Sequence, residues 1–229
     1  MIRNLYRRRH FIVSAASGAL VGVCVGLFAP AALAQAKAPA PTARTPVLLV
    51  VGDSLSAEYG LARGTGWVAL LEKQLAQDKM NVSVVNASVS GETTSGGRSR
   101  LTALLAQHRP SHLVIELGGN DALRGLPLKN TEENLTWMTQ TAQKAGAKVL
   151  LVGMQVPPNY GTDYANRFAG LFTTVAQAQK AAVVPFLLKG VADGPDPTRL
   201  FQPDRIHPRA EAHPQMLANV WPELKKLLR

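Results

Sequence analysis

Hydrophobic residues gather in five short runs along the chain, and mixed or polar segments separate these runs. The runs are apolar on successive positions rather than alternating, which is typical of strands buried on both faces of a parallel sheet. Helical patterns lie between them, which favours an α/β protein with helices on both faces of the sheet. We therefore expect a flavodoxin-like, three-layer α/β/α fold with a five-stranded parallel sheet. The expected strands are 47–51, 82–87, 112–117, 148–153 and 182–186.

Apolar positions at helical spacing predict the helices that connect these strands. Asn130, with Glu133 three residues later, is expected to cap the third of them. The segment 163–180 is a weaker fourth. Pro222 interrupts the last pattern, so we expect a kink or two short helices there. The marking residues are Trp67, Leu70, Leu71 and Leu75, then Leu101, Leu104 and Leu105, then Leu135, Met138 and Ala142, and finally Met216, Leu217, Val220, Trp221, Leu224 and Leu228.

The N-terminal segment has the layout of an export signal. Four arginines between residues 3 and 9 precede an apolar run at 11–28, and Ala-Leu-Ala at 32–34 offers a cleavage site. The alternative is a retained membrane anchor, although glycines and alanines make the run only mildly hydrophobic. The pair Arg8 and Arg9 also resembles a twin-arginine signal, so the export route stays open. We expect residues 1–34 to be a signal peptide, 35–45 a flexible linker, 46–229 the functional domain, and the protein to be periplasmic or secreted.

Composition narrows the chemistry. The only cysteine, Cys24, lies in the expected signal, so the remaining domain has no disulfide, cysteine nucleophile or cysteine-based metal site. Four of the 25 Lys and Arg residues and none of the 15 Asp and Glu residues precede residue 35, which leaves a formal charge of +6. The positive residues are scattered and not interleaved with aromatic residues, so we expect no nucleic acid partner. A basic surface can attract anionic lipids or acyl substrates, but a soluble basic surface explains it more simply.

Glycine and small polar residues follow three of the expected strands. They fill residues 52–55, 88–93 and 118–121. Each group alone reads as an ordinary turn. Because the carboxyl ends of parallel strands meet at one edge of the sheet, three such loops together predict a ligand site there.

Ser54 follows the first strand directly and needs a base to become a nucleophile. His108 and His112 flank the start of the third strand, at the opposite edge, and are expected to be structural. His213 has no carboxylate three residues earlier and is expected on the surface at a helix start. His207 has Asp204 at that offset, and a tight turn can set the carboxylate against the imidazole. We therefore expect Ser54 as nucleophile, His207 as base and Asp204 as the residue that orients it.

Acyl transfer also requires donors for the oxyanion. The backbone N–H groups of Ser54 and Gly91 and the side-chain amide of Asn120 are the available donors. Asn120 can also be a plain turn residue, but its place after two glycines at a strand end favours a functional role.

These residues resemble a known family, the SGNH hydrolases or GDSL esterases. Residues 52–55, Gly91, 118–121 and 204–208 match its four blocks in order, over roughly residues 46–228. Segments 86–93, 116–125 and 158–161 are most similar to the bacterial periplasmic arylesterase and multifunctional acyl-CoA thioesterase–lysophospholipase group. Two departures stand out: Arg205 occupies a position that is usually glycine, and Ala122 one that is often glycine in near relatives.

The resemblance implies the same fold, the dyad Asp204–His207, and Ser54, Gly91 and Asn120 around the oxyanion. It also implies that the loop at 123–127 borders the acyl site and moves on binding, and that Tyr160 is a further substrate-binding residue. The substrate-binding residues are Leu123, Arg124, Gly125, Leu126, Pro127 and Tyr160.

We therefore expect a secreted serine hydrolase for carboxylic esters and thioesters, of the arylesterase, acyl thioesterase or lysophospholipase type. It needs no metal or organic cofactor, acts on a small acyl substrate with transient lipid contact, and is expected to be a monomer. One alternative is a carbohydrate O-acetylesterase on the same catalytic set. Another is a non-catalytic periplasmic binding module, against which the filled catalytic positions argue. A metal-dependent phosphatase is weaker, because no His and Asp cluster has ligand spacing.

Overall fold

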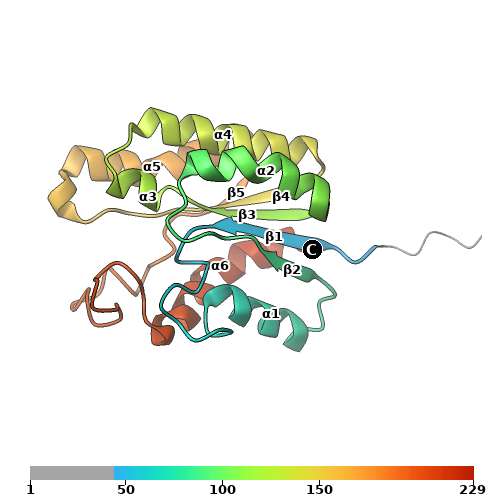
Figure 1. Cartoon of the computed structure of the whole chain (residues 1–229), viewed down its shortest axis with the longest axis horizontal. Helices are drawn as coiled ribbons and strands as arrows, with labels where there is room; N and C mark the ends of the chain where they lie inside the picture. The colour runs from blue at the N-terminus through green and yellow to red at the C-terminus, as the bar shows by residue number, and fades with distance from the viewer. Residues whose placement is uncertain (1–43) are drawn as a thin grey trace, which may run out of the picture. The chain divides into compact units, whose positions relative to one another are not determined.

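A computed structural model describes residues 44–229. The expected signal peptide at 1–34 and nearly all of the expected linker lie outside the described residues. Five strands form one all-parallel sheet in the order β2-β1-β3-β4-β5 (Figure 1). This is the flavodoxin-like order, so the predicted fold is confirmed. The strands are β1 (Val47–Gly52), β2 (Ser83–Asn86), β3 (His112–Glu116), β4 (Lys148–Val152) and β5 (Ala182–Val184).

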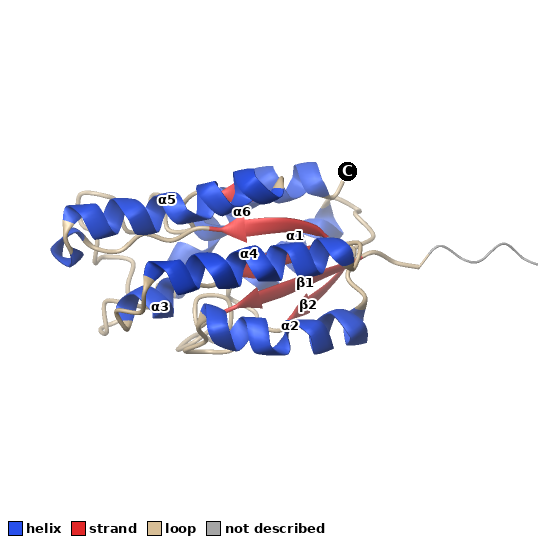
Figure 2. Cartoon of the chain, turned by 90° about the horizontal axis from the view of Figure 1, so that it is seen from above, coloured by secondary structure: helices blue, strands red, loops and turns tan. Residues whose placement is uncertain are grey.

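Helices cover both faces of the sheet. The first and last, α1 and α6, pack together on one face, while α2, α4 and α5 form the layer on the other (Figures 1 and 2). None of the helices in the described part of the chain has the length and apolar character needed to cross a membrane. The α-helices are α1 (Trp67–Gln77), α2 (Thr94–His108), α3 (Gly119–Leu123), α4 (Leu128–Lys144), α5 (Thr162–Gln179) and α6 (His213–Leu227), with 3₁₀ turns η1 (Pro158–Tyr160) and η2 (Ala210–Ala212).

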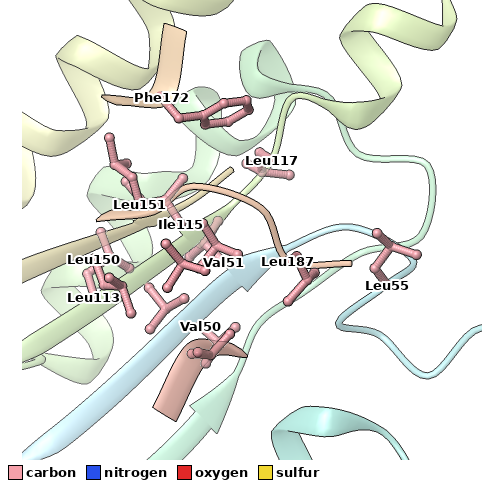
Figure 3. Close-up of a cluster of buried hydrophobic side chains, with 14 of the residues drawn as sticks. Val50, Val51, Leu55, Leu113, Ile115, Leu117, Leu150, Leu151, Phe172 and Leu187 are labelled. Atoms are coloured by element: carbon pink, nitrogen blue, oxygen red, sulfur yellow. The ribbon is translucent and has the colours of Figure 1, made fainter. Parts of the chain in front are cut away.

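The core lies on both faces of the central strands. Residues 48–51 of β1 are fully buried, as expected for a strand between two helical layers. Figure 3 shows Val51, Ile115 and Leu151 from three adjacent strands together with Phe172 of α5. The edge strand β2 is partly exposed and only four residues long, because it has a neighbour on one side alone.

Two helix predictions are wrong in detail. The expected third helix corresponds to α4. It starts at Leu128 after Pro127, so Asn130 lies inside its first turn and does not cap it. The last helix, α6, runs through Pro222 to Leu227, so of the two expected outcomes, a kink or two short helices, the second is wrong. Met216, Val220 and Leu224 are fully buried on either side of the proline, and this continuous packing stabilises the helix across the missing N–H.

Candidate active site

Ser54 lies where the sheet changes its winding direction. It follows β1, and the chain leaves β1 through α1 on one face of the sheet but leaves the neighbouring strand β3 through α4 on the other face. Ligands bind at such points in α/β sheets. The chain turns there through two hydrogen bonds, in which the N–H groups of Ser56 and Ala57 donate to the carbonyl of Asp53 at 3.2 and 2.9 Å. Ser54 remains half-buried in this turn, with its side chain accessible from the edge of the sheet.

His207 reaches Ser54 from the long connection after β5. Its Nε2 lies 2.9 Å from Ser54 Oγ, and its Nδ1 lies 2.7 Å from Asp204 Oδ2. Because an ionised carboxylate only accepts hydrogen bonds, Nδ1 carries the proton, and Nε2 of the neutral ring accepts the serine O–H. The structure thus brings together the three residues that the sequence predicts, across 153 positions of chain.

The turn around Asp204 holds its carboxylate in place. The N–H groups of Ile206 and His207 both donate to Asp204 Oδ1 at 3.0 Å. Partial desolvation raises the pKa of Asp204, but the hydrogen bonds from the His207 ring and from these two backbone groups outweigh it and lower the pKa to about 2. The carboxylate is therefore ionised at neutral pH.

Tyr59 also contacts the imidazole, and sequence reasoning missed it. The two ring centroids are 4.3 Å apart with a tilt of 36°. Gln202 fixes the backbone on both sides of this contact, because its Nε2 donates to the carbonyls of Tyr59 at 3.0 Å and Pro208 at 3.1 Å. An aromatic residue five positions after a candidate nucleophile carries no local signal for a contact with a residue 148 positions later.

The three expected oxyanion donors differ in whether they already donate hydrogen bonds within the protein. Within residues 44–229, the N–H groups of Ser54 and Gly91 donate no hydrogen bond to a protein acceptor. Asn120 Nδ2 donates to Asp53 Oδ2 and to the carbonyl of Glu92, both at 3.0 Å. One of these contacts must open before the amide can donate to a ligand.

The second and third loops are tied together. Asp121 Oδ2 accepts the N–H of Thr94 at 2.8 Å, and Arg124 Nη2 donates to the carbonyl of Gly91 at 2.8 Å. These bonds fix the Gly91 segment beside the segment that carries Asn120. Arg124 therefore stands at the site, at the end of α3.

The other predicted substrate-binding residues lie along the same edge with fewer contacts. Leu123 is 45% exposed at the end of α3. Gly125 has φ 63°, with open space where a side chain would begin. Leu126 donates its N–H to the carbonyl of Asp121 at 2.9 Å. Pro127 follows it, immediately before α4. Tyr160 lies in η1 and stacks on Tyr164 with ring centroids 6.4 Å apart.

His112 and His213 have structural contacts, and the burial of His213 differs from the expectation. His112 is buried and its Nε2 bonds the carbonyl of Leu227 at 2.9 Å, as predicted for a residue far from Ser54. His213 starts α6 as predicted, but it is 2% exposed and not on the surface. Its Nδ1 accepts the N–H of Trp67 at 2.9 Å, so it satisfies the first turn of α1. Burial lowers the pKa of His213, which keeps the ring neutral and able to accept.

Arg205, the departure from the family's usual glycine, has a left-handed backbone with φ 59°. Its side chain is exposed. Glycine adopts this conformation without the steric cost that a Cβ imposes. The position next to Asp204 therefore favours glycine for geometric reasons, and the arginine bears some strain.

Arg205→Gly is expected to raise the free energy of unfolding by up to about 1 kcal/mol. Relief of about 1–2 kcal/mol of left-handed strain exceeds the roughly 0.5–1 kcal/mol of added chain entropy. Urea denaturation measures the change. Lys180→Gly is the matched control, because Lys180 at the end of α5 has the same conformation with φ 52°. A loss of stability in Arg205→Gly alone would mean that the arginine side chain holds the turn.

Among residues 44–229, no group of three or more His, Asp or Glu side chains is placed to hold a metal ion. The residues that converge on Ser54 are a base, a carboxylate and backbone and amide donors. Together they can activate a hydroxyl and stabilise a negative oxygen beside it.

Comparison with known proteins shows the family to which this chain belongs. The model of the GDSL-like Lipase/Acylhydrolase family matches residues 50–214. Esterase TesA of Pseudomonas aeruginosa is 52% identical over 181 residues, which are 79% of this chain and 89% of that protein. Thioesterase 1/protease 1/lysophospholipase L1 of Escherichia coli K12 is 40% identical over 167 residues, 73% of this chain and 77% of that protein. A crystal structure of TesA matches with a TM-score of 0.76 at 51% identity, covering 79% of this chain and 99% of that one. The chain belongs to the GDSL-like lipase/acylhydrolase family, the SGNH hydrolases that its four sequence blocks resemble.

Proposed function

We propose that this protein hydrolyses carboxylic esters and thioesters with Ser54 as nucleophile, His207 as base and Asp204 as the residue that orients the base. The observation that carries the proposal is the unbroken relay from Ser54 Oγ to His207 Nε2 at 2.9 Å and from His207 Nδ1 to Asp204 at 2.7 Å. Such a relay removes the serine proton as the oxygen attacks.

The reaction has two halves. Ser54 Oγ attacks the acyl carbonyl while Nε2 of His207 takes its proton, and the carbonyl oxygen becomes an anion that the N–H groups of Ser54 and Gly91 and the amide of Asn120 stabilise. The imidazolium then gives its proton to the departing alcohol or thiol. In the second half, water loses a proton to His207, attacks the acyl-serine and releases the acid, and the proton returns to Ser54.

The substrate class rests on the relatives. One is named an esterase and another a thioesterase and lysophospholipase. Esters and thioesters share an acyl carbonyl, and the relay acts on that carbonyl. The proposed substrate is therefore a small acyl ester or thioester.

Activity against a series of acyl chains tests the proposal. Purified protein is assayed with p-nitrophenyl esters from acetate to palmitate and with one acyl thioester. Turnover of medium chains and of the thioester is the expected result. Turnover of acetate alone would favour a carbohydrate O-acetylesterase. If the folded protein turned over nothing and a fluorophosphonate did not label Ser54, a binding module would replace this proposal.

Transient lipid contact is part of the proposal. Five large hydrophobic side chains of residues 44–229 are exposed, and each belongs to the connection after a different strand: Tyr59, Val89, Leu123, Tyr160 and Ile206. All five connections leave the edge of the sheet that carries Ser54. An apolar rim at this edge suits substrates presented at a lipid surface. Flotation with phosphatidylcholine vesicles tests this contact, and a Val89→Ser, Ile206→Ser protein that floated equally well would contradict it.

Export and a monomeric state complete the proposal. Export is supported by the layout of residues 1–34 and is tested by N-terminal sequencing of protein from the periplasmic fraction; an intact residue 1 there would contradict cleavage.

A monomer is supported by the complete relay within one chain. Light scattering on the purified protein tests it, and the mass of a dimer would overturn it.

A further inference from the structure

Two buried carboxyl groups lie directly behind Ser54, and the mechanism above does not use either. Asp53 precedes Ser54 and is 2% exposed, and Glu116 ends β3 and is fully buried. The end of β1 pairs with the end of β3, with Gly52 opposite Glu116. The chain thus places two acids next to each other in its interior, which is costly unless a proton or hydrogen bonds compensate.

Glu116 holds the proton of this pair. Burial raises the pKa of Glu116 well above its usual range, and the neighbouring charge of Asp53 raises it further. Burial also raises the pKa of Asp53, but the N–H of Leu55, the charge of His207 and the amide of Asn120 lower it, and the result is about 6. At neutral pH, Glu116 is therefore a neutral acid, and Asp53 is largely ionised.

Glu116 is tightly enclosed. Its Oε2 accepts the hydroxyl of Ser56 at 2.7 Å, and that hydroxyl accepts the indole N–H of Trp67 at 3.1 Å. A Cβ at Gly52 would come within 2.8 Å of Glu116 Oε2, so no side chain fits there. The acid therefore has one position, beside Asp53, whose backbone N–H donates to Oε2 at 3.4 Å.

Both carboxylate oxygens of Asp53 accept hydrogen bonds from the loops that follow β1 and β3. Oδ1 accepts the N–H of Leu55 at 3.0 Å, and Oδ2 accepts Nδ2 of Asn120 at 3.0 Å. A carboxylate accepts only, so rotating the Asn120 amide by 180° would bring its oxygen against Asp53 Oδ2. The contact permits one orientation of the amide.

We infer that Asp53 is a positioning residue for the oxyanion hole: its carboxylate, held by the N–H of Leu55, keeps the NH₂ group of Asn120 turned toward the reacting carbonyl oxygen. The inference rests on the proposed function, because it acts through the same oxyanion. One hydrogen of the amide stays on Asp53 throughout. The other leaves the carbonyl of Glu92 and donates to the oxyanion as the tetrahedral intermediate forms.

A double-mutant cycle tests this role. The side chain in Asp53→Asn has one acceptor oxygen and cannot serve both Leu55 and Asn120. Loss of one oxyanion donor costs about 10²–10³-fold in kcat, so loss of its orientation is expected to lower kcat by about 10–100-fold, with KM changed by less than about threefold. In an Asn120→Ala background the same change is expected to lower kcat by less than about threefold.

The cycle separates this role from the other effect that Asp53 has. The charge of Asp53 also interacts with that of His207, and losing this interaction would lower kcat equally in both backgrounds. Equal losses would overturn the inference. Asp163→Asn is the matched control, because this exposed aspartate undergoes the same chemical change at the start of α5. Full activity in Ser54→Ala would contradict the proposed function instead, so the two failures are distinguishable.

A second measurement tests the inference without the Asp53→Asn variant, so that the test also stands if this variant does not fold. In ¹⁵N-labelled His207→Ala protein, the side-chain amide resonance of Asn120 is identified by its loss in the further variant Asn120→Ala. Its shift is expected to titrate between pH 5 and 8 as the carboxyl pair takes up a second proton. An amide shift that stayed constant while the Asp53 carboxyl carbon, followed by ¹³C in the same titration, showed that Asp53 takes up its proton would overturn the inference.

Discussion

Ser54→Ala is expected to lower kcat by at least about 10⁴-fold, because the acyl group then has no oxygen to which it can transfer. The change removes only Oγ, whose partner in the structure is the His207 ring at 2.9 Å. The backbone N–H of residue 54 remains, so the oxyanion hole keeps that donor. Residual hydrolysis then reflects binding and oxyanion stabilisation without covalent catalysis.

Steady-state hydrolysis of a medium-chain ester measures this effect, and thermal unfolding shows that the variant is folded. Ser83→Ala is the matched control, because Ser83 is exposed at the start of β2, at the opposite edge of the sheet, and undergoes the same change. It is expected to stay within about twofold of wild type, since surface substitutions away from special contacts have small effects. A Ser54→Ala protein with full activity would exclude Ser54 as nucleophile.

The fold was predictable because its strongest determinants are local. The central strands β1, β3 and β4 are buried on both faces, so each is a continuous apolar run that is visible in the sequence. Helix ends were less predictable. Whether Pro222 divides α6 depends on the packing of Met216 and Leu224, and this packing comes from other parts of the chain.

The arrangement of the catalytic residues was predictable for a topological reason. Every strand of a parallel sheet ends at the same edge, so residues after β1, β2 and β3 had to meet there. The turn that sets Asp204 on His207 is local as well, with two residues between the partners.

The surroundings of these residues could not be predicted. The contact of Tyr59 with His207 and the burial of His213 join segments more than 140 positions apart. The pairing of Asp53 with Glu116 follows from the register of β1 and β3, which the sequence alone does not state. Asn120 was identified as a donor, but its engagement by Asp53 and Glu92 requires the folded loops.

Removing the imidazole of His207 is expected to lower kcat by at least about 10³-fold, and added imidazole is expected to restore part of the loss. General acid–base catalysis contributes about 10²–10⁴-fold, and a nucleophile and base that act as a unit lose more. In His207→Ala, the Asp204 carboxylate stays oriented because the backbone N–H groups of residues 206 and 207 hold its Oδ1. The emptied position also keeps the Tyr59 ring, which lies 4.3 Å from the native imidazole.

The rescue is measured on an alkyl ester, because imidazole itself attacks activated p-nitrophenyl esters. Ser54→Ala with the same imidazole concentrations supplies the background rate, which is subtracted. Rescue should saturate with imidazole and follow its neutral form, since the bound ring must accept the serine proton at one nitrogen while it donates to Asp204 with the other. If His207→Ala kept its activity without imidazole, another group would be the base. If it lost activity and imidazole restored none above background, the role of the ring would extend beyond proton transfer to holding the loop around Asp204.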